Sequence, residues 1–217
     1  MKKKVIISIV SIIFVIALGT TIYAQSAYPD DNLFYSIGKL FTTQKNSPKT
    51  RGSEKIYAKG KDITITWDEV NEIKERMDLA ELKDSEDNAY KYVLQRKVLL
   101  NAAEKAGYKV TDQEVEETIE TYKKNINEAT NKEEFDALIE GAGGETKYWE
   151  SLKSTTRTTL MISKYLTDKQ KEFSGNQENN TKVTIGGNGD LNDPWEDEKG
   201  KIIQKLIAEQ DIKIIKE

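Results

Sequence analysis

The stretch AYKYVLQRKVLLNAAEKAGYKVTDQEV, residues 89–115, predicts two helices joined by a short extended link. The apolar side chains of residues 98–103 nearly surround the helix axis, which is typical of a helix that is buried on most sides. Gly107 follows this helix, and glycine favours the left-handed conformation in which many helices end. We therefore expect a central helix over residues 85–106.

Two capping boxes and one further capped start mark the beginnings of helices along the chain. In such a box, a short polar side chain and an acid three residues later satisfy the first backbone N–H groups of the helix. The pairs are Thr66 with Glu69, Thr111 with Glu114, and Asn131 with Glu134. Apolar residues at helical spacing follow each pair, and a longer stretch with this spacing covers residues 146–173. The chain is therefore expected to be mainly α-helical, with a small β element.

Two short segments at opposite ends of the sequence have the pattern of strands. Residues 56–65 predict a hairpin with its turn at 59–62. Near the C-terminus, Pro194 is placed to begin a helix, and residues 212–215 predict a last strand. A strand needs an edge with which to pair, and the hairpin offers the other strands. We therefore expect the C-terminal helix and strand to return to the N-terminal hairpin.

The N-terminus has the pattern of a membrane anchor. Three lysines at residues 2–4 precede an uncharged apolar run over residues 5–24. About 20 helical residues cross a bilayer, and the lysines favour the cytoplasmic side. Residues 1–27 are thus expected to be a transmembrane signal anchor at the cell membrane, with the rest of the chain outside the cytoplasm. A secretory signal cleaved near Ala24 is the alternative, and it makes the chain a secreted protein.

The remainder is expected to contain one domain. Residues 28–53 are polar and are interpreted as a linker, in which the apolar cluster at 33–41 forms either a short amphipathic helix near the membrane or a flap on the domain. Residues 54–217 are interpreted as a single helical domain. Within it, residues 174–193 are rich in glycine and asparagine and are expected to form a flexible loop.

Composition excludes several classes of function. The chain has no cysteine and no histidine, which excludes disulfides, thiolate zinc sites and the usual serine–histidine and cysteine–histidine nucleophiles. Without the three N-terminal lysines, 30 basic residues stand against 37 acidic ones, a net charge of −7. An acidic domain is a poor candidate for binding nucleic acid. We expect no nucleic-acid partner and no cofactor.

Neither the paired acids nor the acidic loop indicates a site. Asp68 with Glu69 and Glu116 with Glu117 have the composition of a glycosidase pair, but acids in first turns and on exposed helix faces are explained by solvation and the helix dipole. Residues 188–193 have the alternating oxygen ligands of a calcium loop. They lack its glycine and its final glutamate, so we expect no metal site.

The order of these features resembles the N-terminal domain of SurA/PrsA-type chaperones. In that family an opening hairpin, several helices and a C-terminal helix with a strand form one unit that binds unfolded polypeptide without catalytic residues. The similarity covers residues 56–215. The residues that carry it are Leu94, Arg96, Leu99, Leu100, Ala103, Ala106, Gly107, Val110, Thr111, Asp112, Glu114, Val115, Phe135, Leu138, Tyr148 and Trp149.

The sequence departs from this family in two ways. A parvulin-type prolyl isomerase domain normally stands between the long helix and the C-terminal helix, whereas here only residues 174–193 occupy that interval. So short and polar a stretch cannot bury a core, and the histidines of parvulin sites are missing. PrsA-like proteins are also lipoproteins, whereas this chain has no cysteine to carry a lipid.

Together with the anchor expected at residues 1–27, the resemblance implies a membrane-anchored extracytoplasmic protein with chaperone-like activity and no enzymatic activity. Its expected partners are unfolded or newly secreted polypeptides; an envelope scaffold that uses the same fold for one specific partner is the alternative. The oligomeric state is not predicted. Aromatic and methionine side chains suit adaptable peptide binding, although they also commonly fill cores. The candidate peptide-binding residues are Trp67, Tyr92, Tyr148, Trp149, Met161, Tyr165 and Trp195.

Overall fold

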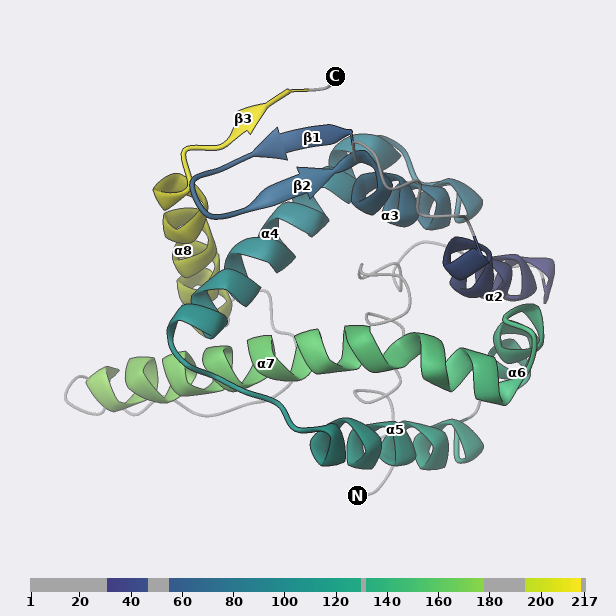
Figure 1. Cartoon of the computed structure of the whole chain (residues 1–217). Coiled ribbons are helices and arrows are strands. Elements are labelled where there is room, and N and C mark those ends of the chain that lie inside the picture. The colour runs from purple at the N-terminus through teal and green to yellow at the C-terminus, as the bar shows by residue number, and fades with distance from the viewer. Residues whose placement is uncertain (1–30, 47–54, 130–131, 178–193, 216–217) are drawn as a thin grey trace.

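The computed structural model of the chain describes residues 31–46, 55–129, 132–177 and 194–215. These residues form a mainly helical fold with a small three-stranded sheet (Figure 1). The helices are α2 (Asp31–Asn46), α3 (Trp67–Leu79), α4 (Ser85–Lys105), α5 (Asp112–Asn127), α6 (Lys132–Gly141), α7 (Glu145–Gln177) and α8 (Pro194–Glu209), and the strands are β1 (Ile56–Lys59), β2 (Thr64–Thr66) and β3 (Lys213–Ile214).

Several features predicted from the sequence fall on residues that the structure does not describe. The anchor at 5–24, the calcium-like stretch at 188–193, and Asn131 of the third capped start lie outside the described residues. Within the described ranges, no helix is both long and apolar enough to cross a membrane.

The predicted hairpin is confirmed. β1 pairs antiparallel with β2, with Ala58 opposite Ile65 and Lys59 opposite Thr64. The register shifts between Ile56 and Ala58, and such a shift lets two successive side chains turn to the same side. Tyr57 and Ala58 are accordingly both buried.

The predicted helix starts at Thr66 and Thr111 are also confirmed. Each threonine side chain accepts a hydrogen bond from the backbone N–H three residues later, and the glutamate there accepts one in return. α4 ends close to the predicted position, and Gly107 follows with a φ of 84°. α4 packs against α3, α7 and α8, so it is the central helix that its apolar surface predicts.

The C-terminal helix and strand return to the hairpin as predicted. β3 pairs antiparallel with β1, with Ala58 opposite Ile214, and the strand order is β2-β1-β3 (Figure 1). Gln210 holds this corner: its backbone carbonyl accepts a hydrogen bond from Lys61 N–H, and its side-chain Oε1 accepts one from Asp62 N–H. The hairpin and the C-terminal strand are therefore joined in one sheet.

The buried residues form two main clusters. We call the first the helical core; it lies between α2, α5, α6 and the first half of α7 (Phe34, Ile37, Phe41, Val110, Val115, Ile119, Tyr122, Ile126, Phe135, Leu138, Ala142, Tyr148, Trp149 and Leu152). We call the second the sheet core; it lies between the hairpin, α3 and α4 (Tyr57, Ala58, Ile63, Ile65, Val70, Ile73, Met77, Ala89, Val93, Leu94 and Val98). A small cluster of Leu99, Ala103 and Tyr165 lies where α4 crosses α7.

The expected linker at residues 28–53 is not borne out over 31–46, which form α2. Phe34, Ile37 and Phe41 lie at helical spacing on one side of α2 and are buried in the helical core. The amphipathic-helix alternative is therefore correct in form, but the apolar face of the helix packs against α6 and α7. The polar composition of the whole stretch concealed this buried face.

α2 and α6 meet backbone to backbone. A Cβ atom added at Gly38 would lie 2.1 Å from the carbonyl oxygen of Leu138, and one added at Gly141 would lie 2.0 Å from that of Tyr35. Only glycine fits at such a distance, because any larger residue would push the two helices apart. α2 is thus an integral part of the domain.

α7 is longer than predicted. It continues through residues 174–177, the first part of the expected flexible loop 174–193. Phe173 contacts Trp195 at the start of α8, with ring centroids 6.1 Å apart, and this contact supports the last turns of α7.

Candidate functional site

Two of the predicted peptide-binding aromatics lie inside the helical core. Tyr148 is completely buried and Trp149 nearly so, and their ring centroids are 4.9 Å apart. Phe41 packs edge-on against Tyr148 at 5.6 Å. Burial raises the pKa of Tyr148, and the nearby Arg76 only partly opposes this effect. Tyr148 thus packs α7 against Phe41 of α2, and neither Tyr148 nor Trp149 is available to a partner.

Trp67 and Tyr92 lie at the margin of the sheet core. Both are half-buried. Trp67 packs against Tyr57, with ring centroids 4.6 Å apart, and the Tyr92 hydroxyl accepts a hydrogen bond of 3.4 Å from Arg96. Arg96 also donates to the carbonyl oxygen of Thr155 on α7, so this group joins α4 to α7.

The remaining three candidates lie along α7 and α8. Tyr165 is buried where α4 crosses α7, and Met161 is half-buried nearby. Trp195, at the start of α8, is half-buried against Phe173. The structure therefore does not bring the seven predicted residues to one surface. Tyr148, Trp149 and Tyr165 fill cores, as the alternative interpretation of the aromatics expects.

An apolar strip does remain partly accessible along α8. None of the residues of this helix is fully buried, although its apolar side chains face α4 and α7. Phe173 and Trp195 extend the strip toward the end of α7. The half-buried apolar side chains on α8 are Trp195, Ile202, Ile203, Leu206 and Ile207.

Two basic side chains of α7 clamp the link between α4 and α5. Arg157 donates a hydrogen bond of 2.8 Å to the carbonyl oxygen of Val110 and forms an ion pair with Asp112. Lys164 donates to the carbonyl oxygen of Lys109 at 2.9 Å and forms an ion pair with Glu114. These contacts fix the direction in which α5 leaves the link.

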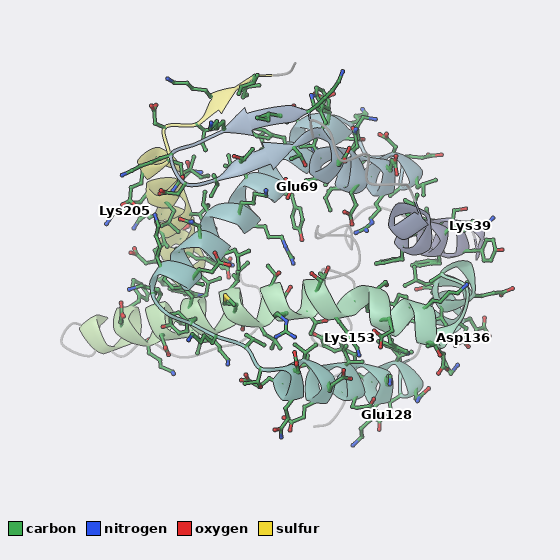
Figure 2. The ribbon with its side chains drawn as sticks, in the orientation of Figure 1. Lys39, Glu69, Glu128, Asp136, Lys153 and Lys205 are labelled. Carbon is green, nitrogen blue, oxygen red and sulfur yellow. The ribbon has the colours of Figure 1, made fainter. Side chains whose placement is uncertain are left out.

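The same helix is tied to α5 by a shared lysine. Lys153, between α5 and α7 in Figure 2, lies 2.7 Å from a carboxylate oxygen of Glu116 and 2.7 Å from one of Glu150. The hydrogen bonds to these two carboxylates raise the pKa of Lys153. One of the acid pairs considered above thus contributes to an ion pair between helices.

The carboxyl groups whose pKa is shifted are suited to ion pairing and not to acid catalysis. The hydrogen bond from Lys164, with two from Thr111, lowers the pKa of Glu114 to about 2. Lys171 and the Tyr108 hydroxyl likewise lower the pKa of Asp168, and Lys105 lowers that of Asp62. A general acid at neutral pH needs a raised pKa, so these groups are poor candidates for that role. No group of potential metal ligands occurs among the described residues.

One residue with a clear structural role was missed in the sequence. Gln210 is buried at the corner between α8 and β3, where it contacts the hairpin turn through its backbone and side chain. Asp211 follows it with a φ of 48°, a left-handed conformation that turns the chain into β3. A polar residue between the helix predicted after Pro194 and the strand predicted at 212–215 was the available signal.

Comparison with known proteins gives no match for this chain: no family model, no curated protein and no solved structure.

Proposed function

We propose that this chain is an extracytoplasmic, membrane-anchored protein that holds unfolded or newly secreted polypeptide in the manner of SurA/PrsA-type N-terminal domains. The observation that carries the proposal is the return of the tail to the hairpin, with β3 paired to β1. This closure completes the order of elements through which the sequence resembles that family. The tether is the apolar run at residues 5–24, preceded by three lysines.

The apolar strip on α8 and the end of α7 supports a holding activity. Half-buried aliphatic and aromatic side chains can contact apolar client segments and release them again without a change in fold. Phe173 and Trp195 are the aromatic members of the strip. A client would be bound by apolar contact alone, without a cofactor and without covalent chemistry.

The proposal includes no prolyl isomerase activity. Between α7 and α8 the chain has only residues 178–193, whose composition is dominated by polar residues and glycine. So short a segment cannot bury a separate hydrophobic core. Binding and release of clients are therefore the whole of the proposed activity.

An aggregation assay with the full chain in lipid nanodiscs tests this function. We expect light scattering from a thermally unfolding model protein to fall as the chain is added, and empty nanodiscs to have no effect. Phe173→Ser should weaken the suppression because it removes an aromatic side chain from the strip. Leu79→Ser is the matched control, since Leu79 is an exposed apolar residue on α3, away from the strip.

Two results would contradict the proposal. Undiminished scattering at an excess of the chain would exclude a holding activity. Recovery of a single stoichiometric partner from envelope extracts, together with undiminished scattering, would favour the scaffold alternative.

A further inference from the structure

The outer side of β3 has no strand partner among the described residues. The sheet order β2-β1-β3 places β3 at one edge. Ile215 N–H donates to the carbonyl oxygen of Tyr57, and residues of an antiparallel strand alternate between bonding inward and bonding outward. The N–H and C=O groups of Ile214 therefore point away from β1, toward the outer side.

The opposite edge of the sheet is closed. Gly60 N–H donates to the carbonyl oxygen of Ile63, and by the same alternation the backbone groups of Thr64 point to the outer side of β2. The Lys97 side chain on α4 donates a hydrogen bond to that Thr64 carbonyl oxygen. Lys97 is held there by an ion pair of 2.7 Å with Glu69, at the start of α3 in Figure 2. A lysine placed in this way prevents a further strand from adding to β2.

Ile214 presents an apolar side chain on the open edge. It lies opposite Ala58, which in turn lies opposite Ile65, so the three side chains share one face of the sheet. Ala58 and Ile65 are each only 1% exposed, whereas Ile214 is 55% exposed. The buried face of the sheet therefore continues to β3 without a cover over its last residue.

The other face carries two lysines in direct opposition. Lys59 lies opposite Lys213, and both side chains are exposed. Like charges in this arrangement repel and destabilise the pair of strands. Neither lysine has a carboxylate partner within the ranges that the structure describes. An acidic side chain next to Lys213 would relieve the repulsion.

We infer that β3 binds an extended partner segment in which acidic and apolar residues alternate. The segment adds as a fourth strand and bonds to the outward N–H and C=O of Ile214. Its apolar side chains cover Ile214 on one face, and its acidic side chains lie beside Lys213 and Lys59 on the other. The inference goes beyond the holding activity and does not depend on it, because the tail of a folded partner would fit the edge equally well.

Fluorescence anisotropy with the full chain in nanodiscs and a labelled peptide of about nine alternating Glu and Val residues tests this site. We expect saturable binding of this peptide and little binding of a Lys–Val peptide. Ile214→Pro removes the outward N–H but no bond to β1, and should weaken binding about tenfold, corresponding to one hydrogen bond of about 1.4 kcal/mol. Combined Lys59→Glu and Lys213→Glu should reverse the preference between the two peptides.

Controls separate loss of the edge from loss of the fold. Lys124→Glu, an exposed lysine on α5, makes the same type of charge change far from the sheet and should leave binding unchanged. In Ile214→Pro, continued slow hydrogen exchange at the Ile215 amide should show that β3 still pairs with β1. Equal binding by Ile214→Pro and the wild type would overturn the inference, as would an unaltered peptide preference in the charge-reversed chain. Self-association through β3 without peptide binding would also overturn it.

Discussion

The helical core takes its buried residues from four helices and the link before α5, whereas the sheet core is assembled around a hairpin and the two helices that follow it. The two cores differ in how closely their backbones approach and in whether their buried polar groups have hydrogen-bond partners. In the helical core, α2 and α6 touch through glycine, and the Tyr148 hydroxyl has no hydrogen-bond partner among the described residues. In the sheet core, the Tyr57 hydroxyl donates to Glu86 at 2.9 Å, and Gln210 joins the tail to the hairpin turn.

This difference indicates two sources of stability. The helical core depends on close approach, so it should be most sensitive to added atoms. The sheet core depends more on paired polar groups, so it should be most sensitive to their removal. Substitutions that add or remove single groups in each core can break or sharpen this contrast.

Gly141→Ala should have the largest effect. The added methyl would lie 2.0 Å from the Tyr35 carbonyl oxygen, a backbone atom that cannot move away alone. We expect a loss of about 2 kcal/mol or more in the free energy of unfolding, since overpacking costs about 1–3 kcal/mol and often exceeds the helix propensity gained. Urea denaturation measures this loss.

Gly175→Ala is the matched control for that substitution. Gly175 lies within α7 with no atom near the position of an added Cβ, so the same change should stabilise the chain by up to about 1 kcal/mol. Equal effects of the two substitutions would contradict the role given to the contact between α2 and α6.

Removal of a tyrosine hydroxyl should have opposite effects in the two cores. Tyr148→Phe removes a buried hydroxyl that has no partner, and should raise the free energy of unfolding by about 1 kcal/mol. Tyr57→Phe removes a hydroxyl bonded to Glu86, and should lower the same quantity by about 1 kcal/mol. Thermal unfolding of the two variants measures these effects. Shifts in Tm of the same sign would contradict the proposed difference between the two cores.

Gln210→Ala should loosen the tail more than the rest of the sheet. The variant loses the side-chain bond to Asp62 N–H, which costs about 1 kcal/mol. Hydrogen exchange at the Ile215 amide should accelerate by about tenfold or less, because this amide reports the pairing of β3 with β1. Amides of the helical core serve as the internal control, and equal acceleration there would indicate global destabilisation.

The smallest expected effect is acid sensitivity of the link before α5. The pKa of Glu114 in the folded chain, about 2, lies below its unfolded value of 4.5. The carboxylate therefore contributes stability above pH 4.5, and this contribution is lost as the pH falls from 4.5 toward 2. Glu114→Gln should flatten that part of the stability profile measured by urea denaturation. An unchanged acid limb would exclude a contribution from the contact with Lys164.

The features that could be predicted from sequence are those whose signals are local. The capping boxes at Thr66 and Thr111 and the glycine stop at Gly107 each lie within four residues of the structure they determine. The hairpin and the return of the tail were also predictable. A single terminal strand needs a strand with which to pair, and the hairpin contains the only other strands that the sequence predicts.

The features that were missed depend on distant parts of the chain. The burial of α2 requires α6, which begins at residue 132, so the polar composition of 28–53 gave no indication of it. Tyr148 and Trp149 have the composition of a binding surface, and only the packing of α7 against α2, α5 and α6 makes them core residues. The open edge at Ile214 appears only when the strand order is known.

The pairing of β1 with β3 has a consequence for synthesis of the chain. β1 is synthesised well before residues 213–214. One edge of β1 in the nascent hairpin therefore stays unpaired until β3 has been made. During that interval β1 is the exposed edge, and any extended segment that reaches it first competes with the chain's own tail. A factor that shields this edge until translation ends would therefore raise the yield of folded protein.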